Sequence, residues 1–133
     1  MPQQLDERSR RLIEADNYAQ VGTVRADGFP QVNPTWVDIE DGLILLNSAE
    51  GRLWPRNLRR NGRAALAVQN MHHPEEYVAI RGRLAEETHE GADEHMHKLA
   101  RKYRGDERYP LKEGEVRVIL KIRPEHVHHH GGA

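Results

Sequence analysis

The feature that most constrains this chain is a series of short apolar segments joined by tight turns rather than by long helices. Ala26-Asp27-Gly28 and Asp41-Gly42 each supply residues that favour a hairpin turn. Strands joined by hairpins pair in antiparallel fashion, whereas parallel sheets need a crossover helix between strands. The chain is therefore expected to be mainly β, with its strands in an antiparallel barrel or sandwich.

About six strands and three short helices are expected. The strands are predicted at residues 18–24, 31–39, 43–46, 64–68, 77–85 and 116–122. The helices are predicted at residues 6–15, 51–61 and 91–103, the first with Asp6 as a possible N-cap and the second ended by Asn61-Gly62. The length of 133 residues suits one domain, expected at residues 1–127, with a flexible tail at residues 128–133.

Composition excludes several classes of function. The net charge of −1 gives no support to nucleic-acid binding, and the absence of cysteine excludes disulfides, thiolate nucleophiles and iron–sulfur clusters. No apolar run approaches the roughly 20 residues that cross a bilayer, and the N-terminus has no signal-peptide core. The nine histidines lack the spacing of a zinc enzyme. We expect a cytoplasmic protein with neither a metal nor a nucleic-acid or membrane partner.

The strongest local signal is an arginine-rich segment at residues 51–63, which contains no acid. Its five arginines fall within about one third of the circumference of a helix, while Trp54 and Leu58 lie on the opposite side. These arginines are Arg52, Arg56, Arg59, Arg60 and Arg63. A strand end at 47–49 leads into this helix, so backbone N–H groups lie beside the first arginine, as in an anion site. An ordinary solvated helix face is the alternative.

A second signal is Gln31-Val32-Asn33-Pro34, within a predicted strand. Pro34 cannot donate to a strand ladder, so this strand is expected at an edge or interrupted. Such a break leaves the amides of Gln31 and Asn33 available to a planar heterocycle. A bulge without a ligand is the alternative interpretation.

Segments spread along the chain resemble a known family. They include Val21-Gly22-Thr23-Val24, Gly51-Arg52, Ile80-Arg81-Gly82, Tyr103-Arg104-Gly105 and the closing residues 117–124. In this order they resemble the pyridoxamine 5′-phosphate oxidase-like superfamily of split β-barrels, and within it the flavin and deazaflavin oxidoreductases that use coenzyme F420. The resemblance covers nearly the whole chain. It implies an antiparallel split β-barrel that forms a homodimer with two cofactor sites at the subunit interface.

The resemblance also implies roles for particular residues. The cofactor phosphate is expected at the strand end and helix start, formed by Asn47, Ser48, Ala49, Arg52, Arg56 and Asn57. Gln31, Asn33 and Pro34 are expected beside the deazaflavin ring, and His73 and Pro74 of the partner subunit are expected at the ring's other side. One position departs from the pattern, because Trp54 stands where relatives often have a lysine, and a point charge near the phosphate is lost. Two alternatives would accommodate this change. Either Arg59 or Arg60 compensates for the lost charge, or Trp54 stacks on a ring.

The function expected from this resemblance is that of an F420-dependent reductase. The reduced deazaflavin passes a hydride to a small unsaturated or electrophilic substrate, and the protein supplies binding and orientation. The catalytic residues are unknown, with Tyr77, Tyr103 and Tyr109 as candidate proton donors. One alternative keeps the fold and uses FMN as an oxidase or reductase. Another is a non-catalytic protein that binds F420, haem or a fatty acid, with His72, His73 or a histidine of the tail as an iron ligand.

Overall fold

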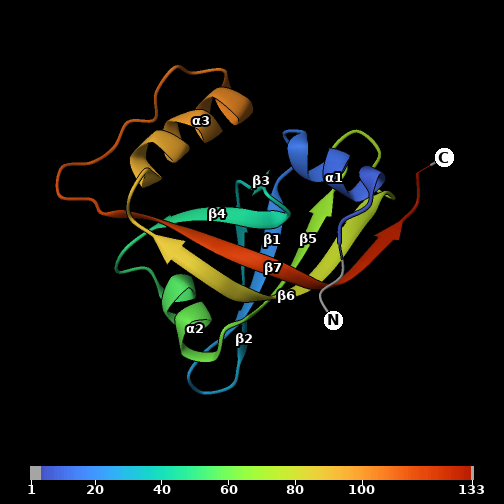
Figure 1. The fold of residues 1–133 in the computed structure, drawn as a ribbon, viewed down its shortest axis with the longest axis horizontal. Coiled ribbons are helices and arrows are strands. Elements are labelled where there is room, and N and C mark those ends of the chain that lie inside the picture. Colours follow the sequence, from blue (N-terminus) through green and yellow to red (C-terminus); the bar gives the residue numbers. More distant parts are fainter. Residues whose placement is uncertain (1–3, 133) are drawn as a thin grey trace.

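The computed structural model describes residues 4–132, which form one antiparallel sheet of seven strands and three helices (Figure 1). The strands are β1 (Ala19–Val24), β2 (Pro30–Thr35), β3 (Asp38–Glu40), β4 (Leu43–Ala49), β5 (Arg63–Gln69), β6 (Tyr77–Thr88) and β7 (Arg117–His130). The helices are α1 (Glu7–Glu14), α2 (Leu53–Asn61) and α3 (Ala92–Arg104). The predicted fold class, mainly β with an antiparallel split barrel, is confirmed.

The sheet is not closed, because its order is β2-β1-β5-β6-β7-β4-β3 and strands β2 and β3 form its two edges. The prediction of one strand at 31–39 was wrong, since residues 36 and 37 leave the ladder between them. Side chains of α3 form hydrogen bonds with the backbone of Val37. The Val37 N–H donates to the Tyr103 hydroxyl (3.0 Å), and the Val37 carbonyl accepts from Lys102 Nζ (2.7 Å). The edge position of β2, expected from Pro34, is confirmed.

Strand β7 continues well beyond the predicted end at residue 122. It bends at Pro124, where the register with β6 shifts between Arg81 and Gly82, and it then pairs with β6 as far as His130. The predicted flexible tail was therefore wrong for residues 128–130, which are paired with residues 77–79. Ala133 lies outside the described residues. This segment is polar because its outer side chains are exposed, so its composition did not predict a strand.

The helix boundaries follow local signals in the sequence. Asp6 accepts a hydrogen bond from the backbone N–H of Ser9 at 2.8 Å, which caps the N-terminus of α1 as predicted. Gly62 ends α2 with a φ of 73°, a conformation that glycine adopts without steric cost. Helix α1 contacts β3, β5 and β6, α2 contacts β1, and α3 contacts β4 and β7. Among residues 4–132, no helix combines the length and apolar character that crossing a bilayer requires.

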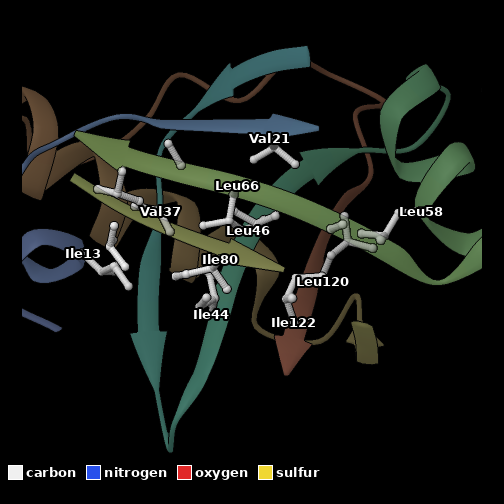
Figure 2. Packing of buried hydrophobic residues seen from close by; sticks show 14 of the residues in the cluster. Ile13, Val21, Val37, Ile44, Leu46, Leu58, Leu66, Ile80, Leu120 and Ile122 are labelled. Carbon is white, nitrogen blue, oxygen red and sulfur yellow. The ribbon is translucent and has the colours of Figure 1, made fainter. Parts of the chain in front are cut away.

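The core lies inside the curved sheet, between its strands and helices α1 and α2 (Figure 2). Strands β4, β6 and β7 contribute Leu46, Ile80 and Leu120, all with at most 2% exposure. Ile13 from α1 and Leu58 from α2 are completely buried and attach these helices to the same cluster. Because Leu58 fixes one side of α2 in the core, the other side of the helix is left for charged residues.

Candidate active site

The five arginines of residues 51–63 do not form one continuous stripe. Arg59 is held by two carboxylates, Glu50 at 2.8 Å and Glu87 at 2.8 Å, and hydrogen bonds to both raise its pKa above the ordinary value. Arg60 donates to the carbonyl oxygen of Val24 at 2.6 Å. Both guanidinium groups thus have partners within the subunit, and neither residue lines the cavity of Arg52 described below.

The other three arginines lie in different places. Gly62 ends α2, so Arg63 begins β5 instead of continuing the helix, and it is exposed there. Arg56 is exposed on α2. Arg52 is the N-cap residue of α2, makes no side-chain cap bond and lines a cavity of about 430 Å³. Of the five, Arg52 is the arginine that the structure brings to this cavity.

The cavity contains two further arginines. Arg104, at the end of α3, and Arg117, at the start of β7, line it together with Arg52. Arg117 is 3% exposed, and burial lowers its pKa; the negative charge of Glu115 opposes this effect, while the positive charge of Arg52 adds to it. Three guanidinium groups with one nearby acid, beside the N-terminus of α2, form a site suited to an anion such as a phosphate.

Three aromatic residues, Tyr18, Trp36 and Tyr109, form part of the cavity wall. The rings of Tyr18 and Tyr103 are stacked with centroids 5.5 Å apart, and the Trp36 ring is stacked on Tyr103 at 5.1 Å. Tyr109 meets Trp36 edge-on at 5.9 Å, and the guanidinium of Arg104 lies over both rings. This wall offers flat apolar surface next to the cationic groups.

Tyr103 is not suited to be the proton donor. Its hydroxyl donates to the carbonyl oxygen of Asn17 at 2.7 Å, and burial raises the pKa of its phenol. Tyr77 lies in β6 and stacks on His130 at 5.2 Å. Tyr109 lines the cavity and is the candidate among the three tyrosines that the structure leaves at this site.

The predicted strand-end residues are divided between the cavity and the interior. Asn47 lines the cavity, whereas Ser48 is 0% and Ala49 6% exposed, and neither lines it. The Ser48 hydroxyl is buried with no hydrogen-bond partner among residues 4–132. The amide of Asn47 is occupied within the protein, since its Oδ1 accepts from Arg117 Nε at 2.9 Å.

The predicted ring-flanking residues form a separate network beside α2. Asn57 is completely buried and donates to the Thr23 hydroxyl at 3.2 Å and to Gln31 Oε1 at 3.4 Å. Gln31 in turn donates to Asn33 Oδ1 at 3.0 Å. Pro34 lies on the same strand and lines the cavity of Arg52. Strand β2 thus connects the amide network with the cationic cavity.

His73 and Pro74 lie in the loop between β5 and β6, at the end of β5 away from α2. They do not line the cavity of their own subunit. Trp54 is 6% exposed and belongs to the core cluster, so the expectation that it stacks on a cofactor ring was wrong. No group of three or more metal-ligating side chains is placed to hold a metal ion in residues 4–132.

Sequence reasoning gave no binding role to Trp36, Arg104 or Arg117, and named Tyr109 only as a candidate proton donor. Trp36, Arg104 and Tyr109 come from loops and element ends that only the packing of α3 on the sheet brings to Arg52. Arg117 alternates with Val118 along the last strand, a pattern that taken alone indicates a solvent-facing position. A signal was present, since Ile119 on the same face as Arg117 indicates that this face is also covered, as α3 in fact covers it.

Comparisons with known proteins give a consistent result. Residues 5–131 match the model of the family described as pyridoxamine 5′-phosphate oxidase. An F420 reductase has a similar structure, with a TM-score of 0.84 and 27% identity over 93% of this chain and 98% of that chain. Two further structures share the fold at lower identity, the Rv2991 protein of Mycobacterium tuberculosis (TM-score 0.73, 18% identity, 97% and 86% coverage) and HupZ of Group A Streptococcus (TM-score 0.67, 20% identity, 96% and 99% coverage). No curated protein matches the sequence.

Proposed function

Because the chain belongs to the pyridoxamine 5′-phosphate oxidase family, whose fold binds flavins or deazaflavins, we propose that it is an F420-dependent oxidoreductase. The proposed reaction is the reduction of a small unsaturated or electrophilic substrate, for which a bound reduced deazaflavin would supply the hydride. The observation that carries the proposal is the convergence of three guanidinium groups and an aromatic wall in one cavity. The similarity to an F420 reductase over nearly the whole of both chains supports it.

The residues of the cavity fit the chemical groups of such a cofactor. Arg52 and Arg117 supply charged donors for a phosphate, and the first turn of α2 adds backbone N–H groups without a side-chain cap competing for them. Trp36 and Tyr109 supply aromatic surface beside these charged groups for a planar tricycle. Pro34 of the edge strand β2 lines the same cavity, and the amides of Gln31 and Asn33 lie on the same strand.

When bound, the deazaflavin supplies the hydride chemistry. Arg52, Arg104 and Arg117 would hold the phosphate, and Trp36 and Tyr109 would orient the ring. The aromatic wall excludes water from one side of the cavity. Tyr109 is the group from which a proton reaches the substrate in this proposal, since the Tyr103 hydroxyl is committed to Asn17.

The proposal includes a homodimer. A second cavity, of about 640 Å³, lies over β1, β2, β5, β6 and β7, and its lining includes Val32, which is 64% exposed, and Ala65. Phe29 at the nearby β1–β2 turn is 70% exposed. This apolar face would pack on the same face of a second copy, and the partner's loop with His73 and Pro74 would then complete the ring site.

Replacing Val32 by Glu is expected to give a monomer in light scattering; a dimer that survives this change would place the interface elsewhere.

A titration tests the cofactor proposal. Purified protein is titrated with oxidised F420 and separately with FMN, with cofactor fluorescence as the readout, and reduced F420 is then supplied with a panel of unsaturated acceptors. We expect saturable binding of F420, tighter than that of FMN, and oxidation of reduced F420 that depends on the acceptor. Arg11→Ala, at an exposed residue of α1, serves as a control of unchanged affinity. Absence of F420 binding at any concentration tested would refute the proposal.

One observation favours FMN as the second candidate. The extended cationic track that suits an oligoglutamate tail is interrupted, since Arg59 and Arg60 are bound within the subunit. The remaining cluster of Arg52, Arg104 and Arg117 is compact and suits a single terminal phosphate. Tighter binding of FMN than of F420 in the same titration would assign the protein to this second function.

A further inference from the structure

Four buried polar side chains from four different elements connect the β3 edge with the cationic cavity. They are Asp38 of β3, His95 of α3, Asn47 of β4 and Arg117 of β7, with exposures of 8%, 8%, 6% and 3%. His95 Nε2 lies 2.9 Å from Asp38 Oδ2, and His95 Nδ1 lies 3.1 Å from Asn47 Nδ2. Asn47 Oδ1 then lies 2.9 Å from Arg117 Nε. The chain of hydrogen bonds is continuous from a carboxylate to a guanidinium of the cavity.

The chemistry of its last member fixes the direction of every bond in this chain. A guanidinium has only donors, so Arg117 Nε–H requires the oxygen of the Asn47 amide. The amide nitrogen of Asn47 must then face the carbonyl oxygen of Ala92, at 3.0 Å, and His95 Nδ1. Because Asn47 donates to Nδ1, that nitrogen must be an unprotonated acceptor. The proton of the neutral imidazole therefore lies on Nε2 and is donated to Asp38.

Asp38 is suited to select this tautomer. Burial alone would raise its pKa, but hydrogen bonds from His95, from Lys98 (3.0 Å) and from the backbone N–H of Ile39 (2.8 Å) outweigh burial and hold the pKa well below its usual range. An ionised carboxylate only accepts hydrogen bonds. It therefore stabilises the imidazole with its proton on Nε2 and disfavours the tautomer with a proton on Nδ1, which would oppose the Asn47 amide.

Arg117 depends on this arrangement for its orientation. Its other contacts are longer or weaker: NH1 lies 3.4 Å from Glu115 Oε1, and NH2 lies 3.3 Å from the sulfur of Met96. The Tyr109 ring is 5.8 Å from the guanidinium carbon. The bond to Asn47 is the shortest of these contacts, and it fixes the plane of the guanidinium at the cavity wall.

We propose that Asp38 and His95 are positioning residues that act through Asn47 to aim the Arg117 guanidinium at the anionic group of the ligand. Neither Asp38 nor His95 lines the cavity, so their effect on binding is indirect. The identity of the ligand rests on the proposed function, whereas the orientation of Arg117 does not. Buried supporting residues of this kind are needed to hold a binding group within a narrow range of geometry.

The first experiment is NMR of the protein without any ligand. The Nε–H signal of Arg117 is assigned by its loss in Arg117→Lys, and the nitrogen shifts of His95 report which ring nitrogen carries the proton. We expect the proton on Nε2 in the wild type. His95→Leu should move or broaden the Arg117 signal, whereas His95→Asn should restore it, because asparagine carries Oδ1 where histidine carries Nδ1.

Further variants test the two ends of this hydrogen-bond chain separately. Asp38→Asn keeps the shape but can donate to His95 Nε2, so we expect a second tautomer of His95 to appear. Lys98→Met is the matched control, since Lys98 binds the same carboxylate from the same helix but lies outside the chain to Asn47. A proton on His95 Nδ1 in the wild type, or an Arg117 signal unchanged by His95→Leu, would overturn the proposal.

The second experiment measures the dissociation constants of F420 and FMN for the same proteins. We expect binding about tenfold weaker in His95→Leu, the size of effect seen when a supporting residue of a binding site is lost. His95→Asn should stay within about twofold of the wild type on the same reasoning, and Lys98→Met should be unchanged.

A changed Arg117 signal with unchanged affinity would show that this orientation does not serve binding. If the wild type binds neither cofactor, the proposed function fails, while the NMR result still decides the orientation of Arg117. If His95→Leu does not fold, Asp38→Asn decides the question, since a single His95 tautomer with an unchanged Arg117 signal in that variant would overturn the proposal.

Discussion

Replacing Arg52 by Ala is expected to separate ligand binding from folding. Arg52 is exposed, and its side chain makes no cap bond to α2, while its backbone N–H bond to Ala49 is retained in the variant. Its positive charge also lies close enough to Arg117 to lower the pKa of that residue. The ligand-free variant should therefore be as stable as the wild type, because the change removes like-charge repulsion and no bond within the protein.

The magnitude follows from the loss of one charged hydrogen bond to the ligand. Such a bond contributes about 2 kcal/mol, which corresponds to about a thirtyfold rise in the dissociation constant. At a ligand concentration of about 100 times the wild-type constant, the wild type gains about 2.7 kcal/mol of stability and the variant about 0.9 kcal/mol. For a chain of this length, the difference of about 1.8 kcal/mol corresponds to about 6 K in melting temperature.

Thermal melts with and without F420 measure this difference, and Arg11→Ala provides an exposed arginine of α1 as the control. The ligand-free melting temperatures of all three proteins should agree, and the shift caused by F420 should be about 6 K smaller in Arg52→Ala alone. The salt dependence of binding should also weaken, since one charge contact is gone. A ligand-induced shift equal to that of the wild type would show that Arg52 does not contact the anion.

Three further predictions concern the fold that supports the site. Leu58→Ala, at a completely buried residue of α2, should lower the melting temperature by about 10 K, from the loss of about 3 kcal/mol. Gly82→Ala should destabilise the protein by about 2 kcal/mol in denaturant titration, because the new Cβ meets the Arg123 carbonyl, whereas Gly22→Ala, with its nearest contact at 3.5 Å, should cost less. The depressed pKa of Asp38 contributes stability that is present above about pH 4 and lost as the pH falls below it, so the free energies of wild type and Asp38→Asn should converge in acid.

The local signals in the sequence were sufficient for most elements of the fold. Asp6 begins α1 with a side-chain cap and Gly62 ends α2 with a positive φ. Both depend only on near neighbours in the sequence, and both were confirmed. The predictions of one strand at 31–39 and of a flexible tail at 128–130 were wrong for the same reason. Tyr103 and Lys102 bind the backbone of Val37 from a distant helix, and residues 77–79 pair with the tail from a distant strand, so neither interaction is visible in a local window.

The sequence by itself determined the antiparallel class, the edge position of the strand with Pro34, and the presence of an arginine at the start of α2. Each of these depends on backbone rules or on spacing along one element. Tertiary structure alone decided which arginine meets which partner. Arg59 forms ion pairs with Glu50 and Glu87, while Arg52 lines one cavity with Arg117 and the aromatic rings. A guanidinium extends several ångströms from its backbone, so its neighbours are groups that only the packed sheet and α3 bring near.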